Sequence, residues 1–110
     1  MLQLPVARLV EFCKAPGGPP QLLDVREPWE VAHAALTVDG IATLALPMNE
    51  IPGRLDELDA ARPIVCICHH GARSAQVVAF LERQGFESVY NLVGGIDAWS
   101  REVDPSVPRY

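Results

Sequence analysis

The chain has 110 residues and a formal net charge of −5, a length that suits one ordinary domain. Its hydrophobic fraction of 49% supplies a core that requires no disulfide or metal for stability. The acidic balance argues against nucleic acid as the main partner, and no apolar run approaches the roughly 18 residues of a membrane span. Three cysteines are a low, odd count that favours a reducing compartment, so we expect a cytoplasmic protein with free thiols.

The first third of the chain predicts two helices around one strand. Residues 2–14 have the apolar spacing of an amphipathic helix with Pro5 in its first turn. The Pro- and Gly-rich residues 15–20 predict a loop. The apolar run 21–25 predicts a buried strand, and a helix is expected over 28–36.

The middle of the chain continues this alternation of strands and helices. A short strand is expected within 38–46, and a helix over about 50–58 with Asn49 as its cap. Residues 64–68 form an apolar run that predicts a buried strand. The next helix, predicted over 74–84, has a regular apolar stripe and is followed by a glycine suited to its C-terminal end.

The last part of the chain predicts one more strand over 87–92 and a short helix that starts at 96–99. Residues 103–110, with two prolines, read as an irregular tail. We therefore expect a single α/β domain over 1–110, with a core of about 4–101 and a mostly parallel sheet.

Residues 68–73 (CHHGAR) join the most apolar strand to the helix that follows, and they are the candidate functional site. Amides in a tight strand-to-helix turn attract negative charge, and a Cys68 thiolate there would be stabilised and nucleophilic. Gly71 permits the backbone conformation that such a turn needs. Arg73 adds a fixed positive charge, and Ser74 is a candidate cap for the helix.

The remaining loop residues are His69, His70 and Ala72, and the two histidines either help to recruit an anion or are simply solvated. A structural interpretation makes Cys68 an inert buried thiol. The glycine, the arginine and the helix start that follow it within a few residues favour a functional role instead. A zinc site would draw on Cys66, Cys68 and the two histidines, yet a second Cys/His pair elsewhere is missing. A nucleotide-binding P-loop is excluded because no Gly-Lys-Ser/Thr sequence is present. Cys66 should share the Cys68 side of the strand and lie buried in the sheet.

Asp24 and Arg26 follow the strand at 21–25, and ligands of open α/β sheets bind beyond such strand ends. For Asp24 we favour a buried structural carboxylate that accepts hydrogen bonds from nearby loop amides. For Arg26, a surface ion pair or a helix cap explains the residue at least as well as a functional role. Both are therefore supporting candidates for the site.

Three stretches together resemble the single-domain rhodanese-like sulfurtransferases: residues 22–27 (LLDVRE), 68–74 (CHHGARS) and 90–99 (YNLVGGIDAW). The resemblance implies a mostly parallel five-stranded sheet flanked by helices, with Cys68 carrying a persulfide inside the 68–73 loop. It also implies Trp99 as a packing residue. The family often has a Gly-His-Ile-Pro-Gly-Ala-like segment where this chain has AHAALTVDG at 32–40. The resemblance therefore does not predict the local structure over about 32–46.

The resemblance implies a two-step sulfur transfer with no cofactor or metal. The Cys68 thiolate takes the outer sulfur of a small anionic donor such as thiosulfate, and a cyanide-like or thiol acceptor, a protein thiol included, removes it. The similar cell-cycle dual-specificity phosphatases carry one more residue between cysteine and arginine, so the four-residue gap favours sulfur over phosphate. The alternative of another class is a non-catalytic interaction or regulatory module with the same fold.

Overall fold

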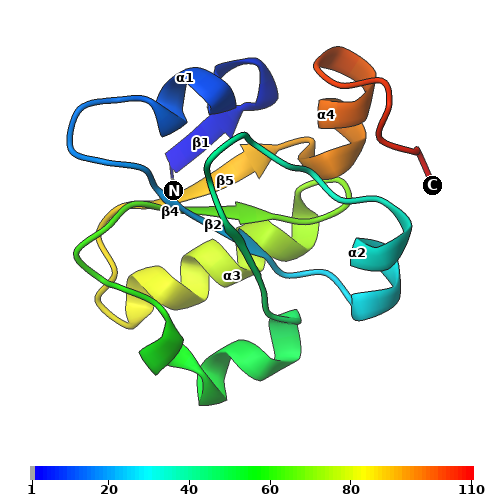
Figure 1. Cartoon of the computed structure of the whole chain (residues 1–110). Coiled ribbons are helices and arrows are strands. Elements are labelled where there is room, and N and C mark those ends of the chain that lie inside the picture. The colour runs from blue at the N-terminus through cyan, green and yellow to red at the C-terminus, as the bar shows by residue number, and fades with distance from the viewer. Residues whose placement is uncertain (1) are drawn as a thin grey trace.

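A computed structural model describes residues 2–110 of the protein. Its centre is a parallel sheet of five strands in the order β1-β5-β4-β2-β3 (Figure 1). In chain order the strands are β1 (Leu2–Pro5), β2 (Gln21–Asp24), β3 (Thr43–Ala45), β4 (Ile64–Ile67) and β5 (Val89–Val93). The predicted α/β class with a five-stranded, parallel sheet is confirmed.

Helices cover both faces of this sheet. They are α1 (Leu9–Cys13), α2 (Pro28–His33), α3 (Ala72–Arg83) and α4 (Gly95–Glu102). Figure 1 shows α1 and α4 on one face and α3 on the other, with α2 beside the end of the sheet where the strands finish. Within residues 2–110, none of the helices combines the length and apolar character that crossing a bilayer would require.

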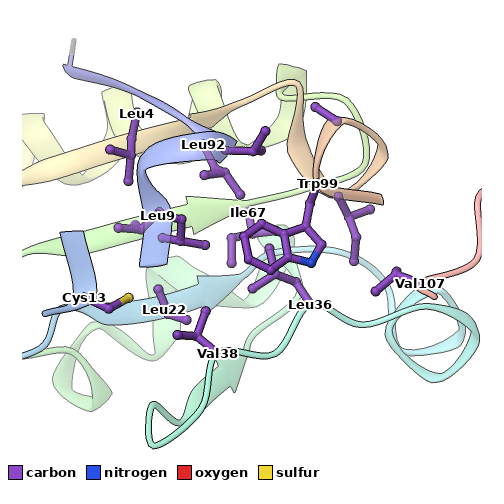
Figure 2. Close-up of a cluster of buried hydrophobic side chains, with 14 of the residues drawn as sticks. Leu4, Leu9, Cys13, Leu22, Leu36, Val38, Ile67, Leu92, Trp99 and Val107 are labelled. Carbon is purple, nitrogen blue, oxygen red and sulfur yellow. The ribbon is translucent and has the colours of Figure 1, made fainter. Parts of the chain in front are cut away.

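The buried side chains form two clusters, one on each face of the sheet. In β4, Val65 and Ile67 belong to the cluster beneath α1 and α4, whereas Ile64 and Cys66 pack toward α3. Figure 2 shows the first cluster, in which Trp99 is surrounded by apolar side chains from distant segments. The alternation of a regular strand thus continues to Cys68, which lies in the α3 cluster with Cys66 as expected.

The N-terminal prediction was wrong for its first residues. Residues 2–5 form the edge strand β1, which pairs in parallel with Tyr90–Val93 of β5, and only Leu9–Cys13 are α-helical after a 3₁₀ turn at Val6–Arg8. Pro5 has no N–H to donate, and the last position of an edge strand tolerates that. The fifth strand of the sheet therefore comes from a segment predicted as helix.

Two predicted helices and one predicted cap also differ from the structure. The expected helix over 50–58 is two 3₁₀ turns, Met48–Gly53 and Leu55–Glu57, because Pro52 and Gly53 interrupt any longer helix. Asn49 lies inside the first turn and does not cap it. The helix predicted over 28–36 ends at His33, since Ala34 is extended and its carbonyl accepts a hydrogen bond from Arg26.

Candidate active site

Cys68 is the first residue after β4, at the carboxyl edge of the sheet, and its side chain is buried. The Gly71 amide donates a hydrogen bond to its Sγ over 3.0 Å, and the Ser74 hydroxyl oxygen lies 3.2 Å from the same sulfur. One group from the loop and one from the first turn of α3 therefore converge on the same sulfur atom. Both contacts need the short spacing between Cys68 and the start of α3.

Ser74 does not cap α3, which starts at Ala72 with Gly71 as its N-cap. Its hydroxyl instead bonds Asn91 Oδ1 on β5. The Asn91 amide nitrogen in turn donates to the Gly71 carbonyl over 3.3 Å and to Gln3 Oε1 over 3.2 Å. Asn91, which was not predicted as a site residue from the sequence, thus ties both sulfur contacts to the sheet.

The N-terminus of α4 fixes the direction of the peptide groups in the 68–73 loop. The Ile96 amide donates to the Cys68 carbonyl over 2.9 Å, and the Asp97 amide donates to the His69 carbonyl over 3.0 Å. Gly95 allows this approach, because a Cβ there would lie 2.4 Å from the Cys68 carbonyl oxygen. This contact is the physical reason for glycine at position 95, whereas a Cβ at Gly94 would meet the Ala98 side chain of α4 at 2.6 Å.

Because the Cys68 and His69 carbonyls point toward α4, the amides of the same peptide units point into the loop. The N–H of a trans peptide points away from its C=O, so the His69 and His70 amides face the opposite side from α4. Within residues 2–110 neither amide donates a hydrogen bond, and the Ala72 amide donates none. Gly71 completes the turn with φ +104°, a conformation that favours glycine. The loop is a cradle of free donors suited to an anionic group or a persulfide.

Arg73 makes a two-pronged ion pair with Glu30 of α2, with N–O distances of 2.7 and 2.8 Å. The Arg73 guanidinium is the main reason that the pKa of Glu30 is lowered to about 2, and the same pair raises the pKa of Arg73. Glu30 was not predicted as a site residue from the sequence. Its position three residues after Glu27 indicates only a capping box, which the structure also contains.

Asp24 and Arg26 form a buried ion pair whose closest atoms are 2.7 Å apart. Arg26 is therefore neither a surface ion pair nor a helix cap; it also donates to the carbonyl of Ala34 and to the hydroxyl of Tyr110. Asp24 accepts from the Arg26 amide and guanidinium. No hydrogen bond joins either residue to the 68–73 loop within residues 2–110, so their support of the site is indirect.

Tyr110 brings the 103–110 segment, predicted as an irregular tail, to the candidate site. Its ring stacks on His69 with 3.8 Å between centroids and an interplanar angle of 4°. Its hydroxyl donates to Glu30 over 3.0 Å and accepts from Arg26 over 2.8 Å. On the other side of His69 lies the exposed His70, and burial followed by the charge of His70 lowers the pKa of His69.

The structure does not assemble the four ligands considered for zinc. Cys66 is buried on the α3 side, where burial raises the pKa of its thiol to about 12. Within residues 2–110 the one candidate metal group is His69, His70 and Asp97, which includes no cysteine. Asp97 is already paired with Arg101 and Arg109, and these positive charges oppose a cation there.

Comparison with known proteins agrees with this geometry. Residues 10–102 match the rhodanese-like domain family. The chain belongs to that family. It is 43% identical over 86 residues to a sulfurtransferase of Allochromatium vinosum, a match covering 78% of this chain and 77% of that one. It is 42% identical over 90 residues to a rhodanese-like/PpiC domain-containing protein of Arabidopsis thaliana, a match that covers 82% of this chain but only 30% of that protein.

The rhodanese-like fold is also seen in solved structures. A rhodanese-related protein from Thermoplasma volcanium superposes with a TM-score of 0.81 at 30% identity, over the full length of both chains. Membership in the rhodanese-like family fits the three motifs that carried the resemblance, and the structure brings them together. The first supplies the Asp24–Arg26 pair, the second supplies the cysteine loop, and the third supplies the helix N-terminus that orients it.

Proposed function

We propose that this protein is a sulfurtransferase that carries sulfane sulfur as a persulfide on Cys68. The observation that carries the proposal is the position of the Cys68 sulfur, held by the Gly71 amide beside inward-facing loop amides. The similarity to a protein named as a sulfurtransferase supports sulfur transfer as the general activity. We further propose that residues 1–110 act as one domain in the cytoplasm.

The proposed reaction has two steps. The Cys68 thiolate attacks the outer sulfur of thiosulfate or a related donor, the S–S bond of the donor breaks, and sulfite leaves with the bonding electron pair. The outer sulfur of the resulting persulfide is then attacked by a cyanide-like or thiol acceptor, and the Cys68 thiolate is released. In each step the loop amides face negative charge on sulfur.

The proposed roles follow the positions of the side chains. Cys68 is the nucleophile, and the 68–73 loop binds the transferred sulfur. Ser74 faces the Cys68 sulfur when that atom becomes the leaving group in the second step. Arg26, which is paired with Asp24, holds the segment after α2 in place through its hydrogen bond to the Ala34 carbonyl.

Thiocyanate formation from thiosulfate and cyanide tests this function. We expect turnover by the wild-type protein, loss of turnover in Cys68→Ser, and retained turnover in the matched variant Cys66→Ser. Turnover that survives in Cys68→Ser would overturn the assignment of the nucleophile. A protein that shows no turnover with any sulfane donor, but captures a partner equally well with and without the Cys68 thiol, would be an interaction module.

A further inference from the structure

The Glu30 carboxylate is fully occupied by groups of the protein itself. It accepts two hydrogen bonds from Arg73, one from the Tyr110 hydroxyl and one from the Glu27 amide. Only 4% of the residue is exposed, and three different parts of the chain supply these donors. Arg73 therefore faces the site already paired with an anion that is fixed in place.

The other cations near the loop are paired as well. Arg26 is buried against Asp24, and both Arg101 and Arg109 bond Asp97. The lowered pKa of His69 keeps its imidazole neutral near pH 7. Among residues 2–110, the loop thus presents neutral amide donors and no unpaired guanidinium to an incoming sulfur donor.

This arrangement has a consequence for the charge of the donor. A dianion such as thiosulfate gains most from a free guanidinium, whereas a donor with a single negative charge is served well by neutral amides. We propose that Glu30 is a specificity-determining residue that occupies Arg73 and so favours singly charged persulfide donors over dianionic ones. This inference rests on the proposed function, since it concerns the donor of the same Cys68 site.

The favoured step uses an alkyl persulfide as the donor. The Cys68 thiolate attacks the terminal sulfur of the persulfide anion R–S–S⁻, a new S–S bond to Cys68 forms, and the donor S–S bond breaks. The alkyl thiolate R–S⁻ leaves with the bonding electrons, and the terminal sulfur, now on Cys68, keeps the negative charge that the loop amides face. The step is a sulfur exchange between two thiolates, so no oxidant or reductant is consumed.

The ratio of kcat/KM for thiosulfate to kcat/KM for an alkyl persulfide tests the proposal. We expect Glu30→Gln, which leaves Arg73 with an unbalanced charge, to raise this ratio roughly tenfold. Glu27→Gln makes the same chemical change three residues earlier at an exposed position and should leave the ratio unchanged. Glu30→Asp keeps the negative charge and should also keep the wild-type ratio, even where both rates fall.

An unchanged ratio in Glu30→Gln, with both donors affected equally, would overturn the proposal and leave Glu30 as a purely structural anchor. Two further measurements use other probes. Calorimetry should show that unreactive sulfate binds more tightly to Glu30→Gln than to the wild type, a result that does not depend on sulfur transfer. In the wild type, thiosulfate loading should not slow as salt is raised, whereas a free cation at the site would make it slow.

Discussion

At the scale of single residues, the direction of the hydrogen bond between Ser74 and Cys68 depends on the charge of the sulfur. The Ser74 hydroxyl donates a hydrogen bond to Asn91 Oδ1, so a protonated Cys68 is the donor in the contact between Sγ and the Ser74 oxygen. When Cys68 is a thiolate, the Ser74 proton can turn toward the sulfur. The pair Ser74 and Asn91 therefore accommodates both charge states of the sulfur without moving the backbone.

Gly95 gives the sharpest prediction at this scale. In Gly95→Ala the new Cβ would meet the carbonyl oxygens of Cys68 and His69 at 2.4 and 2.6 Å, so α4 must move away from the loop. We expect a loss of stability of about 3 kcal/mol in denaturant unfolding, from crowding added to the strain of a positive φ. Loading of Cys68 with sulfur should fall as the loop carbonyls lose their donors.

The matched control is Gly85→Ala. Gly85 also has a positive φ, +96°, but a Cβ there meets nothing within 4 Å. Its substitution should cost about 1 kcal/mol from backbone strain alone and leave sulfur loading intact. Equal stability losses at the two positions would contradict the close approach of α4 to the loop.

At the scale of elements, the 103–110 segment acts as a strap across the edge of the sheet. Val107 is buried in the α1/α4 cluster, Arg109 bonds Asp97 over 3.0 Å, and Tyr110 reaches both Glu30 and His69. The segment thereby connects α4, α2 and the 68–73 loop. The segment follows the last helix and belongs to no strand, and it is also held by hydrogen bonds from the Asp104 amide to the Trp99 carbonyl and from the Ser100 hydroxyl to the Val107 carbonyl.

We predict that Tyr110→Phe lowers the free energy of unfolding by about 2 kcal/mol, because the hydroxyl bonds two charged groups. Tyr90→Phe is the control, since the half-buried Tyr90 hydroxyl makes no hydrogen bond within residues 2–110. It should change stability by less than about 0.5 kcal/mol. Denaturant titration of both variants checks this. Equal losses of stability would contradict a stabilising role for the Tyr110 hydroxyl.

The elements also show why sequence predicted some features and missed others. Cys68 was found because its strand, its glycine, its arginine and the following helix lie within a short span of sequence. Strand β1 was missed because its partner, β5, lies more than 80 residues away and the apolar spacing of residues 2–5 also suits a helix. Glu30 and Tyr110 were missed for the same reason, since their contacts with Arg73 and His69 join distant segments.

At the scale of the whole molecule, the Glu30–Arg73 pair links the site to overall stability. The pKa of Glu30 is about 2 in the folded protein, below its ordinary value of 4.5. A lowered carboxyl pKa stabilises the folded state above pH 4.5, and the stabilisation is lost as pH falls toward 2. Its size is on the order of 3 kcal/mol.

We therefore predict that the stability curves of wild type and Glu30→Gln converge in acid. At pH 7 the variant should unfold at a lower denaturant concentration than the wild type. The difference between their free energies of unfolding should shrink steadily from about pH 5 to about pH 2.5. Urea titrations across this range provide the measurement. A difference that stays constant with pH would show that Glu30 stabilises the fold by packing and not by its charge.

The proposed function requires that Cys68 carry a sulfur atom. Incubation of the wild-type protein with a sulfane donor, thiosulfate or an alkyl persulfide, followed by intact mass measurement without reductant, tests it most directly. We expect the wild type to gain one sulfur atom that cyanide removes, Cys66→Ser to gain as much, and Cys68→Ser to gain none. A wild-type protein that gains no sulfur from either donor, or a Cys68→Ser variant that gains as much as the wild type, would contradict it.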